Sequence, residues 1–324
     1  MLRLVNYFSF MFSAFIIGLF LRRPDLIFIS SPPLFAGPAA VWLSLIKRTP
    51  LALDARDIWP EEAIMMGELK NRFAIFGGRL TAQLLYRNSR LIIAPTEGLN
   101  VRLKNMAPGK EVITVFNGSS FPDINPTYVR VYRRQHEEMT VCYSGVLGLH
   151  KPIEDIINAA EATADDQEIS YLIVGEGVRR ISLLMKVAEK GLHNIHFTGG
   201  VSIEKAFEYM MQSDVGISPL VVTEIFKGAI PAKMFDYMAL GLPIISGVDG
   251  EARELLERNE TGLFYRSGDW QDLRDKILFL KNNPDEARRL GENGRKLVSE
   301  KFRRSQQALQ LEAILSGRFG KKTG

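Results

Sequence analysis

Residues 224–250 of the chain read EIFKGAIPAKMFDYMALGLPIISGVDG. Pro231 favours a helix start, because its fixed φ and missing N–H suit the first turn. Apolar residues then recur at helical spacing as far as Ala239, and Gly241 ends the helix. Residues 243–246 (PIIS) follow as a short buried strand. The stretch therefore predicts a loop, a short helix and a strand.

The start of this helix has the chemistry of a phosphate site. Its first N–H groups are unpaired, and the helix dipole adds a partial positive charge. Lys233 lies in the first turn, where its charge opposes the dipole unless an anion is bound beside it. Asp236, one turn further on, could accept hydrogen bonds from hydroxyl groups. Phosphate and diol together indicate a nucleotide-sugar, and the alternative is a surface helix with an incidental lysine.

Strands and helices alternate along the whole chain, which predicts an α/β fold with parallel, doubly wound sheets. Residues 1–120 are expected to form one Rossmann-like lobe and residues 139–300 a second. Residues 121–138 would link them, and residues 301–324 would form a C-terminal helix and tail. Such sheets bind ligands at the carboxyl ends of their strands, so we expect the site in a cleft between the two lobes.

Two glycine loops follow strands of the second lobe, and each would let the backbone approach a pyrophosphate. Lys151, after the first loop, could reach a diphosphate as a point charge, and its alternative is a solvated surface lysine. Each loop alone is a weak signal, but both lie at strand ends of the sheet that precedes the Lys233 helix. The predicted nucleotide-binding residues are Gly145, Gly148, Lys151, Gly175, Gly177, Lys233 and Asp236.

Length, cysteine count and charge restrict the number of domains, the compartment and the kind of partner that fit this sequence. The 324 residues suffice for two domains with cores, and the one cysteine, Cys142, excludes an internal disulfide and suits a reducing compartment. Residues 1–120 carry 14 Lys/Arg and 8 Asp/Glu, whereas residues 121–324 carry 27 and 29. The basic first half therefore favours an anionic partner. No basic stripe with interleaved aromatics and no recognition motif occurs, so a membrane surface fits better than nucleic acid.

Residues 4–21 (LVNYFSFMFSAFIIGLFL) are strongly apolar and flanked by arginines. Eighteen residues are marginal for a membrane-spanning helix, and no signal-peptide cleavage site follows. Asn6, Ser9 and Ser13 share one helix face, which favours a helix that packs in a domain or lies in the membrane interface. A spanning anchor is the alternative.

The segment PAKMFDYMALGLPII (231–245) resembles the nucleotide-binding segment of glycosyltransferase family 4, retaining enzymes of the GT-B fold. The usual form there is P-S-K-x-x-E-Y-M-A-x-G-x-P-V, so Ala232 stands for Ser and Asp236 for Glu. The resemblance implies that Asp236 binds the ribose of a UDP-sugar. It also implies that Lys233 and the helix N–H groups stabilise the leaving diphosphate. Neither a metal nor another cofactor is implied, and no Asp-x-Asp motif occurs.

The second lobe departs from that family at two positions. Val146 stands where the family has a diphosphate-binding Arg in G-R-L-x-x-x-K-G, although Lys151 is kept. Gly228 stands where the family has a sugar-binding acid, eight positions before Asp236. Glu224 lies nearby and could replace that sugar-binding acid, although its spacing from Asp236 differs from the family's. Glu251 is expected to cap the next helix by its charge rather than to bind ligand.

In the first lobe, DARDIWPE (54–61) resembles the D-x-R-D-x-W-P-E block of bacterial family-4 enzymes related to aminosugar transferases of surface-polysaccharide synthesis. The resemblance makes Arg56 and Asp57 the catalytic candidates of this lobe, alongside Lys233. The alternative is a local Arg–Asp network that only fixes the loop.

Members of this subgroup open with roughly one further β-α-β portion, whereas this sequence enters at the helix before DLIFIS (25–30). We therefore expect an incomplete first lobe, with a fragment, a misassigned start and a natural short form as the alternatives. Its unpaired strand edges and apolar surface would favour association or instability, and a natural short form would favour a partner protein.

The resemblance implies a retaining glycosyltransferase at the cytoplasmic face of the cell membrane. It would transfer an N-acetylated aminosugar from a UDP-sugar to a lipid-linked acceptor, as in lipopolysaccharide synthesis. Two other hypotheses stay open. One is a non-catalytic nucleotide-sugar-binding remnant or partner subunit, which Gly228, Val146 and an incomplete first lobe favour. The other is a UDP-aminosugar epimerase of the same fold, which no motif favours.

Overall fold

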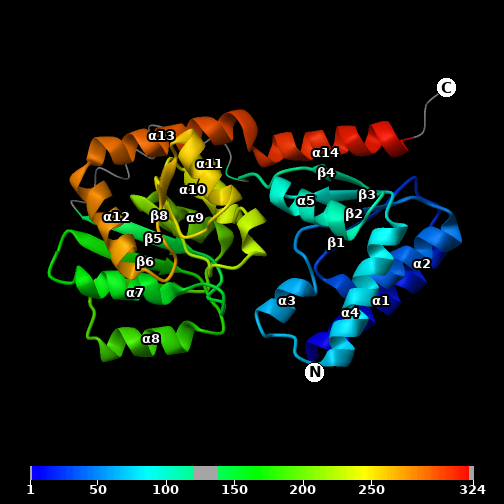
Figure 1. Cartoon of the computed structure of the whole chain (residues 1–324), viewed down its shortest axis with the longest axis horizontal. Coiled ribbons are helices and arrows are strands. Elements are labelled where there is room, and N and C mark those ends of the chain that lie inside the picture. The colour runs from blue at the N-terminus through cyan, green and yellow to red at the C-terminus, as the bar shows by residue number, and fades with distance from the viewer. Residues whose placement is uncertain (1, 120, 122–137, 321–324) are drawn as a thin grey trace. The chain divides into compact units, whose positions relative to one another are not determined.

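A computed structural model describes residues 2–119, 121 and 138–320, and only the backbone of residues 2–5. The chain divides into two compact units (Figure 1). Unit 1 comprises Met1–Phe116 and Gln307–Gly324, and unit 2 comprises Asn117–Gln306. The predicted linker, 121–138, lies outside the described residues apart from its two end positions.

Unit 1 is built on a four-stranded parallel sheet. Its strands lie side by side in chain order: β1 (Ile27–Ser31), β2 (Leu51–Ala55), β3 (Leu91–Ala94) and β4 (Glu111–Thr114). The interior strand β3 reads LIIA and is buried throughout, as expected for a parallel strand covered on both faces.

Helices cover both faces of the unit 1 sheet. One face packs against α2 (Gly37–Lys47), α4 (Arg72–Asn88) and α5 (Glu97–Met106). The other face packs against apolar residues of α14 (Arg304–Phe319), the red helix of Figure 1. Asn71 fixes the start of α4 by accepting hydrogen bonds from the N–H groups of Phe73 and Ala74. The short η1 (Leu34–Ala36) and α3 (Glu61–Met65) complete the unit.

The apolar N-terminal stretch forms α1 (Leu2–Phe20), which packs against η1 and α2. The Phe15 and Trp42 rings, for example, lie 5.7 Å apart edge to face. Ser9 and Ser13 are both exposed, so this part of the predicted polar face is solvated. Within the described part of the chain, no helix has the length and apolarity that crossing a membrane requires.

Unit 2 contains a six-stranded parallel sheet in the order β10-β9-β8-β5-β6-β7. This is the doubly wound arrangement, with the strand order reversing between β5 and β8. The carboxyl ends of β5 and β8 therefore border the position where such sheets bind ligands. The strands are β5 (Met139–Ser144), β6 (Ile169–Val174), β7 (Ile195–Gly199), β8 (Val215–Ser218), β9 (Ile244–Ser246) and β10 (Gly262–Phe264).

The helices of unit 2 cover its sheet and enclose an apolar core centred on β5, β6 and β8. Phe235 and Met238 on α10 are fully buried, which fixes the orientation of that helix. The helices are α7 (Ile153–Ala162), α8 (Arg180–Glu189), α9 (Ile203–Met211), α10 (Ala232–Ala239), α11 (Glu251–Asn259), α12 (Trp270–Asn282) and α13 (Pro284–Lys301), with η2 (Phe226–Gly228) before α10.

The prediction of an α/β fold with two Rossmann-like lobes is confirmed. The sequence analysis did not anticipate α3 or β10. From Gln307 onward, the predicted C-terminal helix belongs to unit 1 and supplies one of its covering layers.

Candidate functional site

The site is built around the start of α10. Pro231 occupies the N-cap position with φ −58° and ψ 130°, and it provides no side-chain cap. The first turn holds no acidic residue. The positive end of the helix dipole is therefore uncompensated by its own side chains, and it is joined there by the cation Lys233.

The Nζ of Lys233 is buried, although part of the side chain remains exposed. It lies 3.7 Å from the centroid of the Tyr143 ring, a cation–π contact with a residue near the carboxyl end of β5. Among the described residues, nothing accepts a hydrogen bond from this Nζ. Burial, followed by the neighbouring charge of Lys151, lowers the pKa of Lys233 well below its ordinary value. An anion bound here would supply the missing acceptor and reverse that shift.

Two further basic side chains, Lys151 and His150, interact electrostatically with Lys233. The pKa of His150 is lowered first by burial and then by the charges of Lys151 and Lys233. The three side chains therefore lie close enough to repel one another as cations. A cluster of mutually repelling basic groups at the carboxyl end of a parallel strand is suited to hold a multiply charged anion such as a diphosphate.

The first glycine loop leaves room for Lys233. Gly145 has φ +145°, and a Cβ at this position would lie 2.7 Å from the Nζ of Lys233. Gly148 lies in the same loop, and a Cβ there would lie 3.3 Å from the His150 imidazole. Glycine is thus required at Gly145 both by its backbone conformation and by the position of the lysine.

The second glycine loop supports the first. A Cβ at Gly175, which has φ +142°, would lie 2.0 Å from the carbonyl oxygen of Gly145. A Cβ at Gly177 would lie 2.4 Å from the carbonyl oxygen of Leu147, whose N–H donates to Glu176 at 2.9 Å. We expected Gly175 and Gly177 to admit a pyrophosphate. The structure adds a packing reason, the close approach of two backbones.

Asp236 lies one turn after Lys233 on α10 and is half-buried. Its Oδ1 accepts a hydrogen bond of 2.7 Å from the Ser119 hydroxyl. Burial raises the pKa of Asp236 to about 6, and Ser119 and the charge of Arg304 oppose that rise. The carboxylate is therefore largely ionised at neutral pH and is suited to accept hydrogen bonds from a diol.

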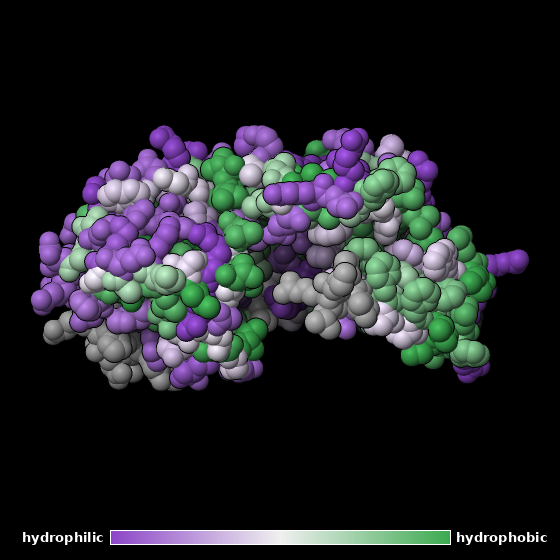
Figure 2. All heavy atoms as spheres, turned by 90° about the horizontal axis from the view of Figure 1, so that it is seen from below, coloured by the Kyte–Doolittle hydropathy of each residue, from purple (hydrophilic) through white to green (hydrophobic). Residues whose placement is uncertain are grey.

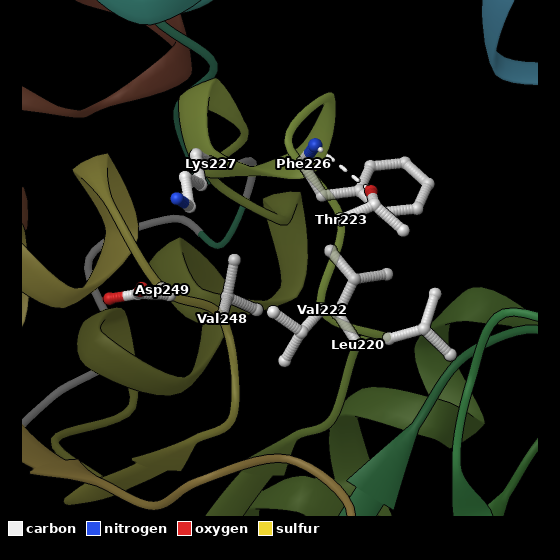
Figure 3. Close-up of a pocket in the computed structure, with 8 residues that line it drawn as sticks. Leu220, Val222, Thr223, Phe226, Lys227, Val248 and Asp249 are labelled. Atoms are coloured by element: carbon white, nitrogen blue, oxygen red, sulfur yellow. Dashed lines mark hydrogen bonds between the residues drawn. The ribbon is translucent and has the colours of Figure 1, made fainter. Parts of the chain in front are cut away.

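A small pocket of about 10 Å³ lies beside this cluster, with room for one water molecule or methyl group (Figure 3). In the close-up, Lys227 and Asp249 lie on one side, and Thr223 and Phe226 lie on the other. His150 interacts with both Lys151 and Lys233 and also lies next to the pocket, because its ring is 6.1 Å from that of Phe226. The lining residues are Leu220, Val221, Val222, Thr223, Phe226, Lys227, Val248 and Asp249.

Of three positions near this site that could hold a sugar-binding or ligand-binding acid, only Glu224 and Glu251 carry a carboxylate. Glu224 forms a 2.6 Å ion pair with Lys227, and its side chain is 78% exposed. Gly228 ends η2 and brings no carboxylate. Glu251 lies in the first turn of α11, where its charge suits the helix dipole as expected.

Arg56 and Asp57 belong to unit 1, where both are exposed directly after β2. The backbone N–H of Arg56 donates to the carbonyl of Ser31 at 3.0 Å, and Asp54 accepts a 2.7 Å hydrogen bond from Ser30. The loop is therefore held from β1 by its backbone and by Asp54, which leaves Arg56 directed to solvent.

No sequence pattern marked Tyr143, Ser119 or His150 as residues of this site. Tyr143 and His150 flank the first glycine loop, but nothing in their spacing marks them as partners of Lys233.

The expected metal-free site stays a prediction. The described residues contain no group of three His, Cys, Asp or Glu side chains that could hold a metal ion. Cys142 is buried, and burial raises its pKa to about 12, so the thiol stays protonated.

Comparison with known proteins agrees with this architecture. In fold, the chain is similar to Anabaena Alr3699/HepE, solved in complex with UDP and glucose, with a TM-score of 0.73 and 19% identity. The alignment covers 90% of this chain and 78% of that one. WaaG, a glycosyltransferase involved in lipopolysaccharide biosynthesis, gives a TM-score of 0.67 at 13% identity, covering 92% and 86% of the two chains.

Similarity in sequence extends to two curated relatives. An uncharacterized glycosyltransferase of Methanocaldococcus jannaschii, MJ1069, is 23% identical over 241 residues, which are 72% of this chain and 60% of the relative. The N-acetyl-alpha-D-glucosaminyl L-malate synthase of Bacillus anthracis is 25% identical over 217 residues, 64% of this chain and 54% of the relative. The chain thus spans less than two thirds of either relative's length.

The family model for glycosyl transferases group 1 matches residues 125–297, which include both glycine loops and α10. This match takes in more than half of the 324 residues and nearly all of unit 2. The chain therefore belongs to the glycosyl transferases group 1 family.

Proposed function

We propose that this protein is a retaining glycosyltransferase of the family-4 type that binds a UDP-sugar in unit 2 and transfers the sugar to a lipid-linked acceptor. The observation that carries the proposal is the buried Nζ of Lys233. It lies at the start of α10 without a hydrogen-bond acceptor among the described residues. A diphosphate would accept from Lys233 and from the first N–H groups of the helix.

The proposed roles follow from the contacts of each side chain. Lys233, Lys151 and the start of α10 hold the diphosphate and stabilise its growing charge as the bond to the sugar breaks. Asp236 accepts hydrogen bonds from the ribose. The acceptor oxygen forms its new bond to the anomeric carbon on the face that the diphosphate leaves. The acceptor's proton passes to an oxygen of that leaving diphosphate.

An N-acetylated aminosugar is the proposed donor sugar. The pocket beside His150 holds about one methyl group and has Leu220, Val222 and Val248 among its walls. An acetamido methyl fits that size and polarity, whereas a hydroxyl would lose its hydrogen bonds there. The name of the Bacillus anthracis relative also refers to an N-acetylglucosaminyl group.

A membrane-bound acceptor is favoured by the surface of unit 1. Large apolar side chains on α1, α2 and α4 are exposed, including Phe73 at 88% and Phe20 at 86%, and Figure 2 shows hydrophobic residues gathered over this unit on the right of the view. We call this surface the apolar face: Phe10, Phe12, Ile16, Ile17, Leu19, Phe20, Trp42, Leu45, Ile46, Phe73, Phe76 and Leu80.

Exposed arginines border the apolar face. Arg22 and Arg23 follow α1, and Arg48 ends α2. Exposed apolar groups beside cations are the combination that adsorbs to an anionic lipid surface. We therefore propose peripheral attachment to the cytoplasmic face of the cell membrane, with Arg56 and Asp57 on the acceptor side.

Transfer is tested by incubating the protein with radiolabelled UDP-N-acetylglucosamine, UDP-N-acetylgalactosamine or UDP-glucose and bacterial membrane lipids. Label that moves into the lipid fraction from an N-acetylated donor, but not with Lys233→Ala protein, supports the proposal. Donor that is epimerised but stays linked to UDP would favour the epimerase instead. UDP binding without either reaction would favour the non-catalytic remnant, which the absence of a carboxylate at Gly228 already makes the second candidate.

A further inference from the structure

The two segments through which the chain passes between unit 1 and unit 2 are paired with each other inside unit 2. The chain enters unit 2 at Asn117 and leaves it after Gln306. Ser119 and Arg303 form a parallel bridge. The Ser119 N–H donates to Phe302 at 3.0 Å, and the Arg304 N–H donates to Ser119 at 2.9 Å. The backbone of Ser119 is therefore held from both sides.

The hydroxyl of Ser119 is held as firmly as its backbone. Ser119 is 4% exposed, and its Oγ accepts a hydrogen bond of 3.1 Å from the N–H of Phe121. The one hydroxyl hydrogen is thereby left for the Oδ1 of Asp236, 2.7 Å away. This hydrogen bond joins the entry segment to α10, the helix that carries Lys233.

The same pair of segments supplies the charge that faces Asp236. Arg304 lowers the pKa of Asp236 through its charge, and its guanidinium donates to the carbonyl of Gly118 at 3.2 and 3.1 Å. Tyr237, the next residue on α10, also interacts electrostatically with Asp236, and its pKa is raised well above the ordinary value, chiefly by burial. Tyr237 therefore stays neutral, and Arg304 and Ser119 favour the carboxylate.

We propose that Ser119 is a positioning residue for nucleotide recognition. Its hydroxyl donates a hydrogen bond to Oδ1 of Asp236 and favours the ionised carboxylate. The second oxygen, Oδ2, then accepts hydrogen bonds from the ribose hydroxyls of the nucleotide-sugar. This inference rests on the proposed function, because it takes a nucleotide with a ribose diol as the ligand of unit 2. It assigns to Ser119 a share in distinguishing ribonucleotides from 2′-deoxyribonucleotides.

The inference predicts a pH dependence with a defined sign. Burial places the pKa of Asp236 at about 6, and below it the protonated carboxyl is a weaker acceptor for the diol. Preference for UDP over dUDP is therefore lost as the pH falls through about 6. Removing the Ser119 hydroxyl removes a hydrogen bond to the charged form, so the midpoint moves to higher pH.

The experiment is calorimetric titration of the whole chain with UDP and with dUDP between pH 5 and pH 8, using wild type and Ser119→Ala. The phosphates of both ligands titrate near pH 6. The ratio of the two dissociation constants cancels that shared titration. At pH 7.5 we expect dUDP to bind wild type about 10-fold more weakly than UDP, the effect of one hydrogen bond to a charged group. At pH 7, Ser119→Ala should bind UDP about 3- to 10-fold more weakly than wild type.

Two further variants separate positioning from folding. Asp236→Asn retains an oxygen that accepts from Ser119 but carries no charge, so its UDP-to-dUDP ratio should be small and independent of pH. Thr163→Ala removes another buried hydroxyl, which contacts Tyr171 and α7 rather than Asp236. It should destabilise the fold without moving the pH midpoint.

Each outcome bears on the inference. A Ser119→Ala curve whose midpoint lies above that of wild type supports it. A ratio that follows the wild-type curve in Ser119→Ala, or that stays pH-dependent in Asp236→Asn, overturns it while leaving the UDP site intact. Absence of UDP binding to wild type overturns the proposed function and this inference with it.

Discussion

Replacing Lys233 with methionine should stabilise the ligand-free protein but abolish UDP binding. Its buried ammonium lacks an acceptor among the described residues, so Lys233→Met should raise the melting temperature of the ligand-free protein by about 2–4 °C, equivalent to ~1 kcal/mol. The same change should abolish UDP binding. Lys205→Met is the matched control, because Lys205 is half-exposed and pairs with Glu208. Unchanged UDP affinity in Lys233→Met would contradict the assignment.

The stability difference at Lys233 should depend on pH. Burial lowers its pKa in the folded state, whereas the unfolded chain retains the ordinary value near 10.4. Between those two values the unfolded state binds the extra proton, so the free energy of unfolding of wild type rises with pH. The advantage of Lys233→Met should therefore shrink as the pH rises through that window. Urea unfolding at several pH values measures it, and a widening gap would be the contrary result.

A side chain at Gly175 should destabilise the ligand-free protein. Its φ of +142° and a Cβ position 2.0 Å from the Gly145 oxygen leave no room for a side chain. Gly175→Ala should lower the free energy of unfolding by about 2–4 kcal/mol through strain and displacement of the first glycine loop. Gly317→Ala is the control, since a Cβ there meets nothing within 4 Å and should be neutral or stabilising. Equal urea midpoints for the two variants would refute the packing reason.

At the scale of elements, the exposed faces of α1, α2 and α4 predict lipid binding. Phe73→Ser with Phe76→Ser removes two strongly exposed rings from α4 and should reduce sedimentation with anionic phosphatidylglycerol vesicles about 10-fold or more. Phe279→Ser, an exposed ring on α12 of unit 2, is the control and should leave binding unchanged. Equal loss from both proteins, or no binding by wild type, would argue against the apolar face.

Elements of ordinary length were predictable because their apolar spacing spans several turns. Helices α4, α5, α9 and α12 have 17, 10, 9 and 13 residues, which is long enough for that spacing to show in the sequence. By contrast, α3 and β10 have five and three residues, too few for a period to show. The start of α10 was predictable from Pro231 and Lys233. Tyr143 and Ser119 were not, because they reach α10 from distant segments and only the fold brings them there.

At the scale of the whole molecule, the two units should respond differently to ligand. A nucleotide that binds at the strand ends of unit 2 stabilises that unit by mass action. Backbone amides of β5 and α10 should therefore exchange hydrogen more slowly with saturating UDP, while those of β2 and β3 in unit 1 should change less. Protection confined to unit 1 would place the nucleotide elsewhere.

Calorimetric titration of UDP into this protein and its Lys233→Ala variant shows whether Lys233 and the start of α10 bind the diphosphate. We expect saturable binding by wild type and loss of binding in a variant that remains folded. Failure of wild type to bind UDP, or equal binding by both proteins, would contradict the claim that α10 and Lys233 form the diphosphate site.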